Sequence, residues 1–247
     1  MSALQDRVAI VTGGAQGIGR HIADRLHAEG ATVVVADLQA AHELAGSLGG
    51  LAVEVDVSDP TACRGMAQAA IDAYGRIDIL VNNAGIYTSL VPTPFEELSI
   101  EEWKRVFDVN VLGMYLATRA VTPHMRAAKY GRIINMASGT PFKGVPFLLH
   151  YVSSKGAVLA MTKALAKELG GDNILVNTVA PGFTMSDGVM ANAVQIQALQ
   201  EASVKARVLV RDQYPEDIVG AVAFFAGEGA SFITGQSLVV DGGAYFN

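Results

Sequence analysis

The chain has 247 residues, of which 51% are hydrophobic and 17% are charged, and its formal net charge is −6. This composition is typical of a globular protein, and the negative charge argues against binding of nucleic acids. No apolar run reaches the roughly 18 residues of a membrane span, and the first residues lack the pattern of a signal peptide, so we expect no membrane association. Cys63 is the single cysteine, which excludes an internal disulfide and favours a reducing, cytoplasmic compartment. The five histidines make no metal-ligand spacing with Cys63, so we expect no metal site.

The first predicted elements are a short strand over residues 8–11, a glycine-rich turn over residues 12–19 and a helix. Ile18, Ile22 and Leu26 are spaced so that they share one face of this helix. Glycines let a backbone approach a pyrophosphate closely, and a helix start offers free N–H groups and the positive end of its dipole. The glycine spacing differs from the Gly-x-Gly-x-x-Gly fingerprint, so a tight turn without a ligand is the alternative.

The next predicted strand covers residues 32–36 and ends in Asp37. A carboxylate about 20 residues beyond a glycine turn can accept hydrogen bonds from the adenosine ribose hydroxyls of a dinucleotide. The same carboxylate would repel a 2′-phosphate, and neither Leu38 nor Gln39 supplies a compensating cation. The sequence therefore favours NAD over NADP, with a simple helix cap at Asp37 as the alternative.

Five further apolar runs predict strands over residues 51–57, 77–81, 133–137, 174–179 and 237–240. Helical patterns alternate with these runs, and no Pro- or Ser-rich linker interrupts them. This alternation predicts an α/β fold with a single doubly wound parallel sheet, Rossmann-like, with helices on both faces and ligands at the carboxyl ends of the strands. We expect one dinucleotide-binding and catalytic domain over residues 1–247, with a substrate lid at about residues 183–213.

Polar residues follow several of these strands. Asp56 and the Val57 backbone end the third strand and are positioned to lie near an adenine, although a turn followed by a helix cap explains them equally well. Residues 82–85, Asn-Asn-Ala-Gly, fit a sheet edge that faces a ligand and also fit a simple turn. Asn110 lies inside a predicted helix that a capping box at residues 99–102 opens, a poor position unless its amide finds a partner.

Tyr151 and Lys155 are separated by one helical turn and therefore share a face of the same predicted helix. A free tyrosine has a pKa of about 10 and is a poor base at neutral pH, but a nearby lysine cation favours the phenolate and lowers this pKa. Ser138 ends the preceding strand, so its hydroxyl can converge with the Tyr151 phenol on one oxygen atom. This arrangement suits proton transfer to or from an alcohol or ketone.

The whole chain resembles a classical short-chain dehydrogenase/reductase. The motifs that carry the resemblance are Thr12-Gly-x-x-x-Gly17-Ile-Gly19, Asn82-Asn-Ala-Gly85, Asn110, Ser138, Tyr151-x-x-x-Lys155, Pro181-Gly182 and the segment 233–243. The resemblance implies four catalytic residues. Tyr151 is the general acid/base and Ser138 polarises the substrate oxygen. Lys155 holds the nicotinamide ribose and lowers the Tyr151 pKa, while Asn110 supports a water that relays protons from Lys155.

The resemblance also implies a set of residues that hold NAD. They are Gly13, Gln16, Gly17, Ile18, Gly19, Asp37, Asp56, Val57, Asn83, Tyr151, Lys155, Pro181, Gly182, Thr184 and Ser186. Ser186 stands where many relatives have threonine, which keeps the hydroxyl. Members of the family are usually homotetramers, and residues 245–246 would suit an interface.

We therefore predict an NAD-dependent oxidoreductase that interconverts a secondary alcohol and a ketone. The alternatives are a 3-oxoacyl thioester reductase and a non-catalytic nucleotide-sensing protein. The predicted pocket is apolar and aromatic, which favours an uncharged substrate of aromatic or hydrophobic character, whereas Lys143 leaves an anionic one open. Its candidate residues are Tyr87, Thr140, Phe142, Phe147, Leu148, Met185 and Met190. We expect His150 to have a packing role.

Overall fold

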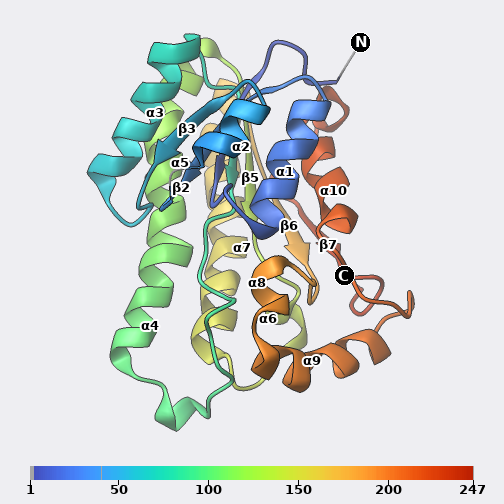
Figure 1. The fold of residues 1–247 in the computed structure, drawn as a ribbon. Coiled ribbons are helices and arrows are strands. Elements are labelled where there is room, and N and C mark those ends of the chain that lie inside the picture. Colours follow the sequence, from blue (N-terminus) through green and yellow to red (C-terminus); the bar gives the residue numbers. More distant parts are fainter. Residues whose placement is uncertain (1–2, 40, 247) are drawn as a thin grey trace.

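The computed structural model describes residues 3–39 and 41–246, and its centre is a sheet of seven parallel strands (Figure 1). The spatial order is β3-β2-β1-β4-β5-β6-β7, so the order reverses between β1 and β4. The strands are β1 (Val8–Thr12), β2 (Thr32–Asp37), β3 (Leu51–Glu54), β4 (Ile79–Asn82), β5 (Gly131–Met136), β6 (Ile174–Pro181) and β7 (Ser237–Val240). This architecture confirms the predicted Rossmann-like α/β fold, and the switch between β1 and β4 is where such sheets bind ligands.

Helices cover both faces of the sheet (Figure 1). The principal helices are α1 (Gly17–Ala28), α2 (His42–Ser47), α3 (Pro60–Tyr74), α4 (Ile100–Phe107), α5 (Met114–Ala128), α6 (Thr140–Lys143), α7 (Leu149–Leu169), α8 (Asp187–Met190), α9 (Ala193–Lys205) and α10 (Glu216–Ala226). Side chains of α1, α2 and α10 share one apolar cluster, and those of α3, α5 and α7 share a second. Buried on both faces, the central strands read as continuous apolar runs, which made them easy to predict. Among residues 3–39 and 41–246, none of these helices is both long and apolar enough to cross a membrane.

The third strand is shorter than the predicted 51–57. It ends at Glu54, which pairs with Asp37 at the end of β2. One further hydrogen bond joins the Val55 N–H to the Asp37 carbonyl oxygen. Because β2 ends there, Asp56 and Val57 have no partner residue of that strand and turn out of the sheet. β6 instead extends beyond the predicted 174–179 to Pro181, because β7 pairs with it as far as Val240.

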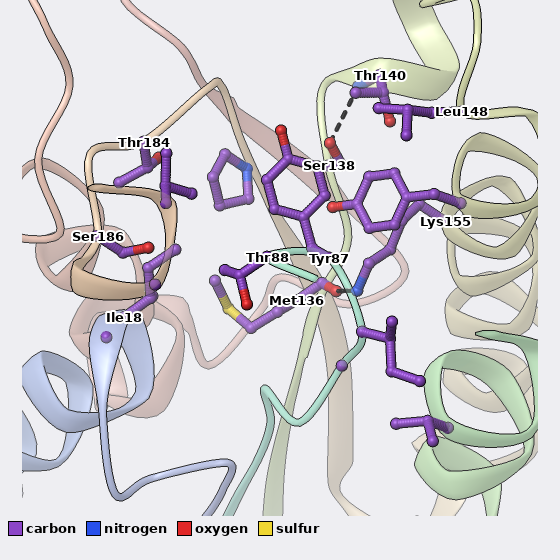
Figure 2. A pocket seen from close by; sticks show the side chains of 18 of the residues that line it. Ile18, Tyr87, Thr88, Met136, Ser138, Thr140, Leu148, Lys155, Thr184 and Ser186 are labelled. Carbon is purple, nitrogen blue, oxygen red and sulfur yellow. Dashed lines mark hydrogen bonds between the residues drawn. The ribbon is translucent and has the colours of Figure 1, made fainter. Parts of the chain in front are cut away.

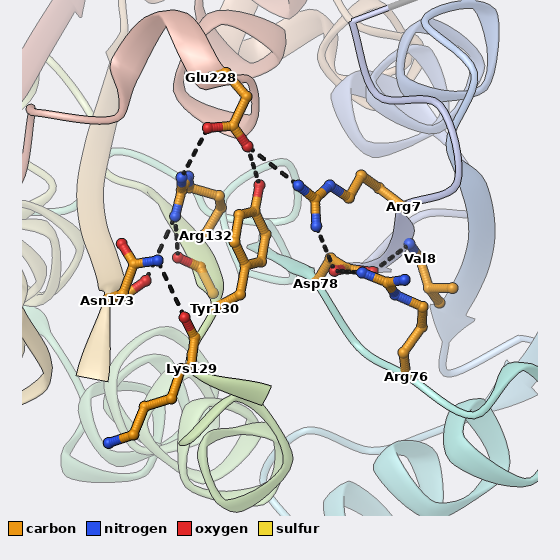
Figure 3. A network of polar contacts seen from close by, with 10 residues as sticks. Arg7, Val8, Arg76, Asp78, Lys129, Tyr130, Arg132, Asn173 and Glu228 are labelled. Carbon is orange, nitrogen blue, oxygen red and sulfur yellow. Dashed lines mark hydrogen bonds and ion pairs between the residues drawn. The ribbon is translucent and has the colours of Figure 1, made fainter. Parts of the chain in front are cut away.

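A polar network closes the edge of the sheet at the amino-terminal ends of the strands (Figure 3). Asp78 is buried and accepts hydrogen bonds from Arg7, Arg76 and the Val8 N–H. The guanidinium groups of Arg7 and Arg132 both lie over the ring of Tyr130, at 3.8 and 4.3 Å from its centroid. This network ties β1, β4 and β5 together at the edge opposite the glycine turn, so its contribution is to stability.

Candidate active site

A cavity of about 1350 Å³ opens at the carboxyl ends of the central strands. Its walls come from the turns after the first six strands, β1 to β6, together with α4, α7 and α9. Figure 2 shows part of this lining. This volume exceeds the range of about 300–1,000 Å³ that is usual for one small molecule, so the cavity has room for a dinucleotide and a substrate together. It contains every residue that we predicted to bind the cofactor.

The glycine turn is folded tightly against the segment that follows β4. Gly13 has φ +62°, and a Cβ atom there would lie 2.8 Å from the Ala84 Cα. A Cβ atom on Gly19 would collide with the Gly13 carbonyl, so both positions require glycine. No side chain of the described residues caps the start of α1, where Gln16 is the N-cap, so the first N–H groups of the helix are available to a phosphate.

Asn83 and Thr12 hold the glycine turn in place. The Asn83 amide donates hydrogen bonds to the carbonyl oxygens of Thr12 and Gly13, at 3.0 and 2.9 Å. The Thr12 hydroxyl accepts hydrogen bonds from the N–H groups of Asn83 and Ala84. The structure therefore gives Asn83 a contact with the turn itself, and its side chain also borders the cavity.

Asp37, the last residue of β2, lies beside the glycine turn. Its Oδ2 accepts a hydrogen bond from the Ala15 N–H at 3.0 Å, which fixes the carboxylate beside the cavity. Asp56 also borders the cavity, but its Oδ1 accepts hydrogen bonds from the N–H and hydroxyl of Ser58. Asp59 caps α3 by accepting from the Thr61 N–H, so the capping alternative is correct for Asp59, while Asp56 occupies a turn in the cavity wall.

Ser138, Tyr151 and Lys155 all line the cavity, and all three are buried. The Ser138 Oγ accepts a hydrogen bond from the Thr140 N–H at 3.1 Å. The Lys155 Nζ lies 5.8 Å from the centroid of the Tyr151 ring and donates a hydrogen bond to the Met136 carbonyl oxygen. The spacing along the sequence thus corresponds to a real cluster of a hydroxyl, a phenol and an ammonium.

Burial dominates the proton affinities in this cluster. It raises the pKa of Tyr151 to about 12, while a hydrogen bond with Ser138 acts in the opposite direction. It lowers the pKa of Lys155 to about 8. We expected the Lys155 ammonium to lower the Tyr151 pKa, but among the groups of the described residues the Ser138 hydroxyl is the one that does so, and desolvation outweighs it.

Asn110 lies in a π-helical turn, residues 108–113, between α4 and α5. Its Oδ1 accepts a hydrogen bond from the Ile86 N–H, and its Nδ2 donates to the Ile86 carbonyl and the Ser154 hydroxyl. A Cβ atom on Gly85 would lie 3.2 Å from the Asn110 Oδ1 and 3.6 Å from the Lys155 Nζ. These contacts describe a satisfied core asparagine beside Lys155, and its role in a proton relay stays a prediction.

The segment after β6 closes the cavity on the side of the glycine turn. Pro181, Gly182, Thr184 and Ser186 all border the cavity. The Thr184 hydroxyl donates a hydrogen bond to the Gly182 carbonyl oxygen. Ser186 faces the glycine turn, because a Cβ atom on Gly17 would lie 3.7 Å from the Ser186 Cβ.

Four of the seven predicted pocket residues line the cavity, namely Tyr87, Thr140, Phe147 and Leu148. The other three are Phe142, Met185 and Met190, and the prediction was wrong for them. Phe142 stacks on Tyr245 near the carboxyl terminus, Met185 is buried outside the cavity wall, and Met190 is exposed on α8.

The structure also shows the surroundings of Lys143, the candidate cation for an anionic substrate, and of His150. Lys143 borders the cavity, but its Nζ lies 2.7 Å from the carboxylate of Asp241, so its charge is already compensated. His150 is fully buried and lies 3.8 Å from Glu102, outside the cavity wall. The expected packing role of His150 agrees with this position.

Fold and site together define an oxidoreductase on a dinucleotide-binding fold, and comparisons with known proteins show its family. A family model described as enoyl-(acyl carrier protein) reductase matches residues 13–245. A cyclopentanol dehydrogenase from Comamonas is 38% identical over 98% of both chains. A meso-2,3-butanediol dehydrogenase from Serratia marcescens is 36% identical over 97% of this chain and 94% of that protein.

The comparison of structures agrees. The crystal structure of a 3-ketoacyl-(acyl-carrier-protein) reductase from Brucella melitensis, complexed with NADH, has a TM-score of 0.90 and 35% identity. The match covers 98% of this chain and all of that one. The chain belongs to the short-chain dehydrogenase/reductase family, as its motifs predicted.

Proposed function

We propose that this protein is an NAD(H)-dependent dehydrogenase that interconverts an uncharged secondary alcohol and the corresponding ketone. The observation that carries the proposal is the convergence of Ser138, Tyr151 and Lys155 in one cavity with the glycine turn. The relatives that act on cyclopentanol and butanediol support an alcohol as the substrate class. The apolar cluster around Tyr151, which includes Leu90, Val106 and Leu148, favours an uncharged molecule.

The residues of the cavity fit NAD. The open N–H groups at the start of α1 would hold the pyrophosphate, and Asp37 would accept hydrogen bonds from the adenosine ribose. Bound NAD would supply the hydride acceptor. Asp37 would also repel the 2′-phosphate of NADP, and the adjacent Leu38 provides no cation. The neighbour complexed with NADH is consistent with this choice.

The protein's own contribution is to orient the substrate and to move its proton. In alcohol oxidation, the Tyr151 phenolate would take the proton of the hydroxyl group, while Ser138 donates a hydrogen bond to the same oxygen. A positive nicotinamide ring would favour that phenolate over the neutral phenol, and the hydrogen bond with Ser138 acts in the same direction. Asn110, which fixes the segment beside Lys155, would support the water that carries the proton to solvent.

A 3-oxoacyl thioester reductase is the second candidate, because the family model and the Brucella neighbour both name acyl-carrier substrates. The exposed Lys104 and Arg105 on α4 border the cavity and would suit an acidic carrier. Asp37 counts against reductases of this class that prefer NADPH, but it does not exclude the class, because the Brucella reductase is complexed with NADH. Oxidation of NADPH by an acetoacetyl thioester would favour this candidate.

We further propose a cytoplasmic homotetramer. The chain exposes apolar side chains in two regions that a second copy would cover. They are Leu112 and Tyr115 near the start of α5, and Val208, Leu209, Val210, Phe232 and Phe246 in the carboxyl-terminal part of the chain. Light scattering coupled to size exclusion tests this proposal, and a monomer would overturn it.

The test of the proposed function is a screen for NADH formation from NAD and a panel of uncharged secondary alcohols. We expect turnover with at least one alcohol, and loss of that turnover in Tyr151→Phe. Binding of NADH without turnover of any alcohol, ketone or thioester would instead support the nucleotide-sensing alternative.

A further inference from the structure

We propose that Tyr87 is a specificity-determining residue that limits the size of one of the two substituents on the carbinol carbon. The proposal rests on the proposed function, because it concerns the substrate of the same site. It assigns to this protein a substrate class of compact, uncharged secondary alcohols with at least one small substituent.

The first observation is the position of the Tyr87 ring. Its centroid lies 4.7 Å from that of Tyr151, with an angle of 41° between the ring planes. In the view of Figure 2, Tyr87 lies in the middle of the cavity, between Ser138 and Lys155 on one side and Thr184 and Ser186 on the other. The ring therefore occupies space directly beside the phenol that we expect to exchange a proton with the substrate.

The second observation is the apolar surface to which Tyr87 belongs. Tyr87 packs on the same buried cluster as Ile86 and Leu199, and this cluster contains Leu148 and Tyr151. Burial raises the pKa of the Tyr87 phenol, and the proximity of Tyr151 adds to the effect, so Tyr87 is neutral at physiological pH. A neutral aromatic wall excludes by shape and attracts apolar groups, and it offers no charge to an ionised substrate.

The third observation is that the backbone on either side of Tyr87 is fixed by amide side chains. Asn110 bonds to both the N–H and the carbonyl of Ile86. Gln195 on α9 donates hydrogen bonds to the carbonyl oxygens of Tyr87 and Leu90, at 2.8 and 2.9 Å. Gln195 has no exposed surface, and its bond to the Leu90 carbonyl is buried, so water does not compete for that bond.

The lid is tied to the same segment. Asn192, which precedes α9, donates a hydrogen bond of 2.8 Å to the Thr88 carbonyl oxygen. A Cβ atom on Gly188 of α8 would lie 2.8 Å from the Thr88 Cγ2, which shows how closely α8 approaches. Because amides from both the core and residues 192–195 hold residues 86–90, the backbone of Tyr87 is fixed. The ring itself is held by its packing against Tyr151 and the apolar cluster, so a bulky substituent must avoid the ring or disturb this packing.

The experiment compares kcat/KM for cyclopentanol and for the bulkier 1-phenylethanol in wild-type protein and in variants of Tyr87. In Tyr87→Ala we expect the kcat/KM for 1-phenylethanol, divided by that for cyclopentanol, to rise at least about tenfold. One methylene in a pocket changes discrimination between substrates by about tenfold or more, and this variant removes a whole ring. Tyr87→Phe keeps the ring, so its ratio should stay within about twofold of wild type. Tyr87→Leu provides an intermediate size if the alanine variant does not fold.

The matched control is Tyr214→Ala, which makes the same chemical change at an exposed position outside the cavity wall. We expect no change in the ratio for this variant. An active wild type with the same ratio in Tyr87→Ala and Tyr87→Leu would overturn the assignment of Tyr87 alone. A wild type without activity on any alcohol would instead overturn the proposed function, so the two failures are distinguishable.

Discussion

The Lys155 ammonium donates a hydrogen bond of 2.7 Å to the main-chain oxygen of Met136 at the wall of the cavity. This partner is neutral, and no carboxylate among residues 3–39 and 41–246 contributes to the proton affinity of Lys155, whose pKa burial lowers to about 8. A buried charge with a neutral partner costs stability. Lys155 therefore lowers the stability of the fold, as expected of a charged group that serves binding and catalysis.

Replacement of this charge should stabilise the protein while abolishing its activity. We predict that Lys155→Met raises the free energy of unfolding at pH 7 by on the order of 2 kcal/mol, since the pKa shift corresponds to about 3 kcal/mol and an unpaired Met136 carbonyl costs about 1. Chemical denaturation of both proteins measures the difference. A variant less stable than wild type at pH 7 would contradict the prediction.

The same prediction has a pH dependence with a definite sign. The folded pKa of Lys155, about 8, lies below the value of about 10.5 for an unfolded lysine. Below pH 8 both states are protonated and the full cost is present; between pH 8 and 10.5 the folded state loses its proton first, so the cost fades. The stability advantage of Lys155→Met should therefore shrink as the pH rises through this window.

Tyr151→Phe should remove turnover with little effect on cofactor binding. The substitution deletes the phenol oxygen, so we expect kcat for alcohol oxidation to fall by at least about 10³-fold and the Kd for NADH to change by less than about threefold. In wild type, oxidation should accelerate as the pH rises above about 7, because burial raises the pKa of Tyr151 to about 12 and a base must be deprotonated. Steady-state rates and NADH fluorescence titration give the two readouts. Turnover close to wild type would show that another group carries the proton.

The local parts of this site were predictable, since they depend on spacing within one element. Tyr151 and Lys155 follow from the helical period, and Asp37 follows from its place after an apolar strand. Contacts between distant segments were not predictable, because no local pattern encodes them. The bond of Lys143 with Asp241 and the position of Gln195 against Tyr87 are of this kind.

Element ends were less predictable than element types. The end of β3 depends on where β2 stops, and the sequence from Leu51 to Val57 does not contain that information. For Asn110, in the π-helical turn, the sequence did contain a signal. An amide inside an apolar helix was a visible signal, but its partners, Ile86 and Ser154, could be identified only from the structure.

Asp37 should determine the choice of cofactor. We predict that Asp37→Ala weakens NADH binding by about 10- to 100-fold, the value of a hydrogen bond to a charged group, and brings the affinities for NADH and NADPH closer together. Fluorescence titration with both nucleotides measures this change. Because Asp37 also accepts the Ala15 N–H, a loosened turn would give a similar loss.

Asp37→Asn separates these two effects. The asparagine keeps an acceptor for the Ala15 N–H but loses the charge that repels a 2′-phosphate. We expect it to retain more of the NADH affinity than Asp37→Ala and to gain affinity for NADPH. A wild-type protein that prefers NADPH would contradict the assignment of Asp37 as the residue that selects NADH.

Asp78 should affect stability and leave activity unchanged. It lies at the edge of the sheet opposite the cavity, where it accepts hydrogen bonds from two arginines and the Val8 N–H (Figure 3). We predict that Asp78→Ala lowers the free energy of unfolding by on the order of 3 kcal/mol, because it leaves Arg7 and Arg76 without their buried partner. The comparison in the same network is Glu228→Ala: Glu228 is 61% exposed, but its loss leaves the 2% exposed Arg132 without a carboxylate, so we expect a cost on the order of 2 kcal/mol. Both variants should keep the wild-type kcat at temperatures where they are folded, and a large fall in kcat for either one would link this network to the active site.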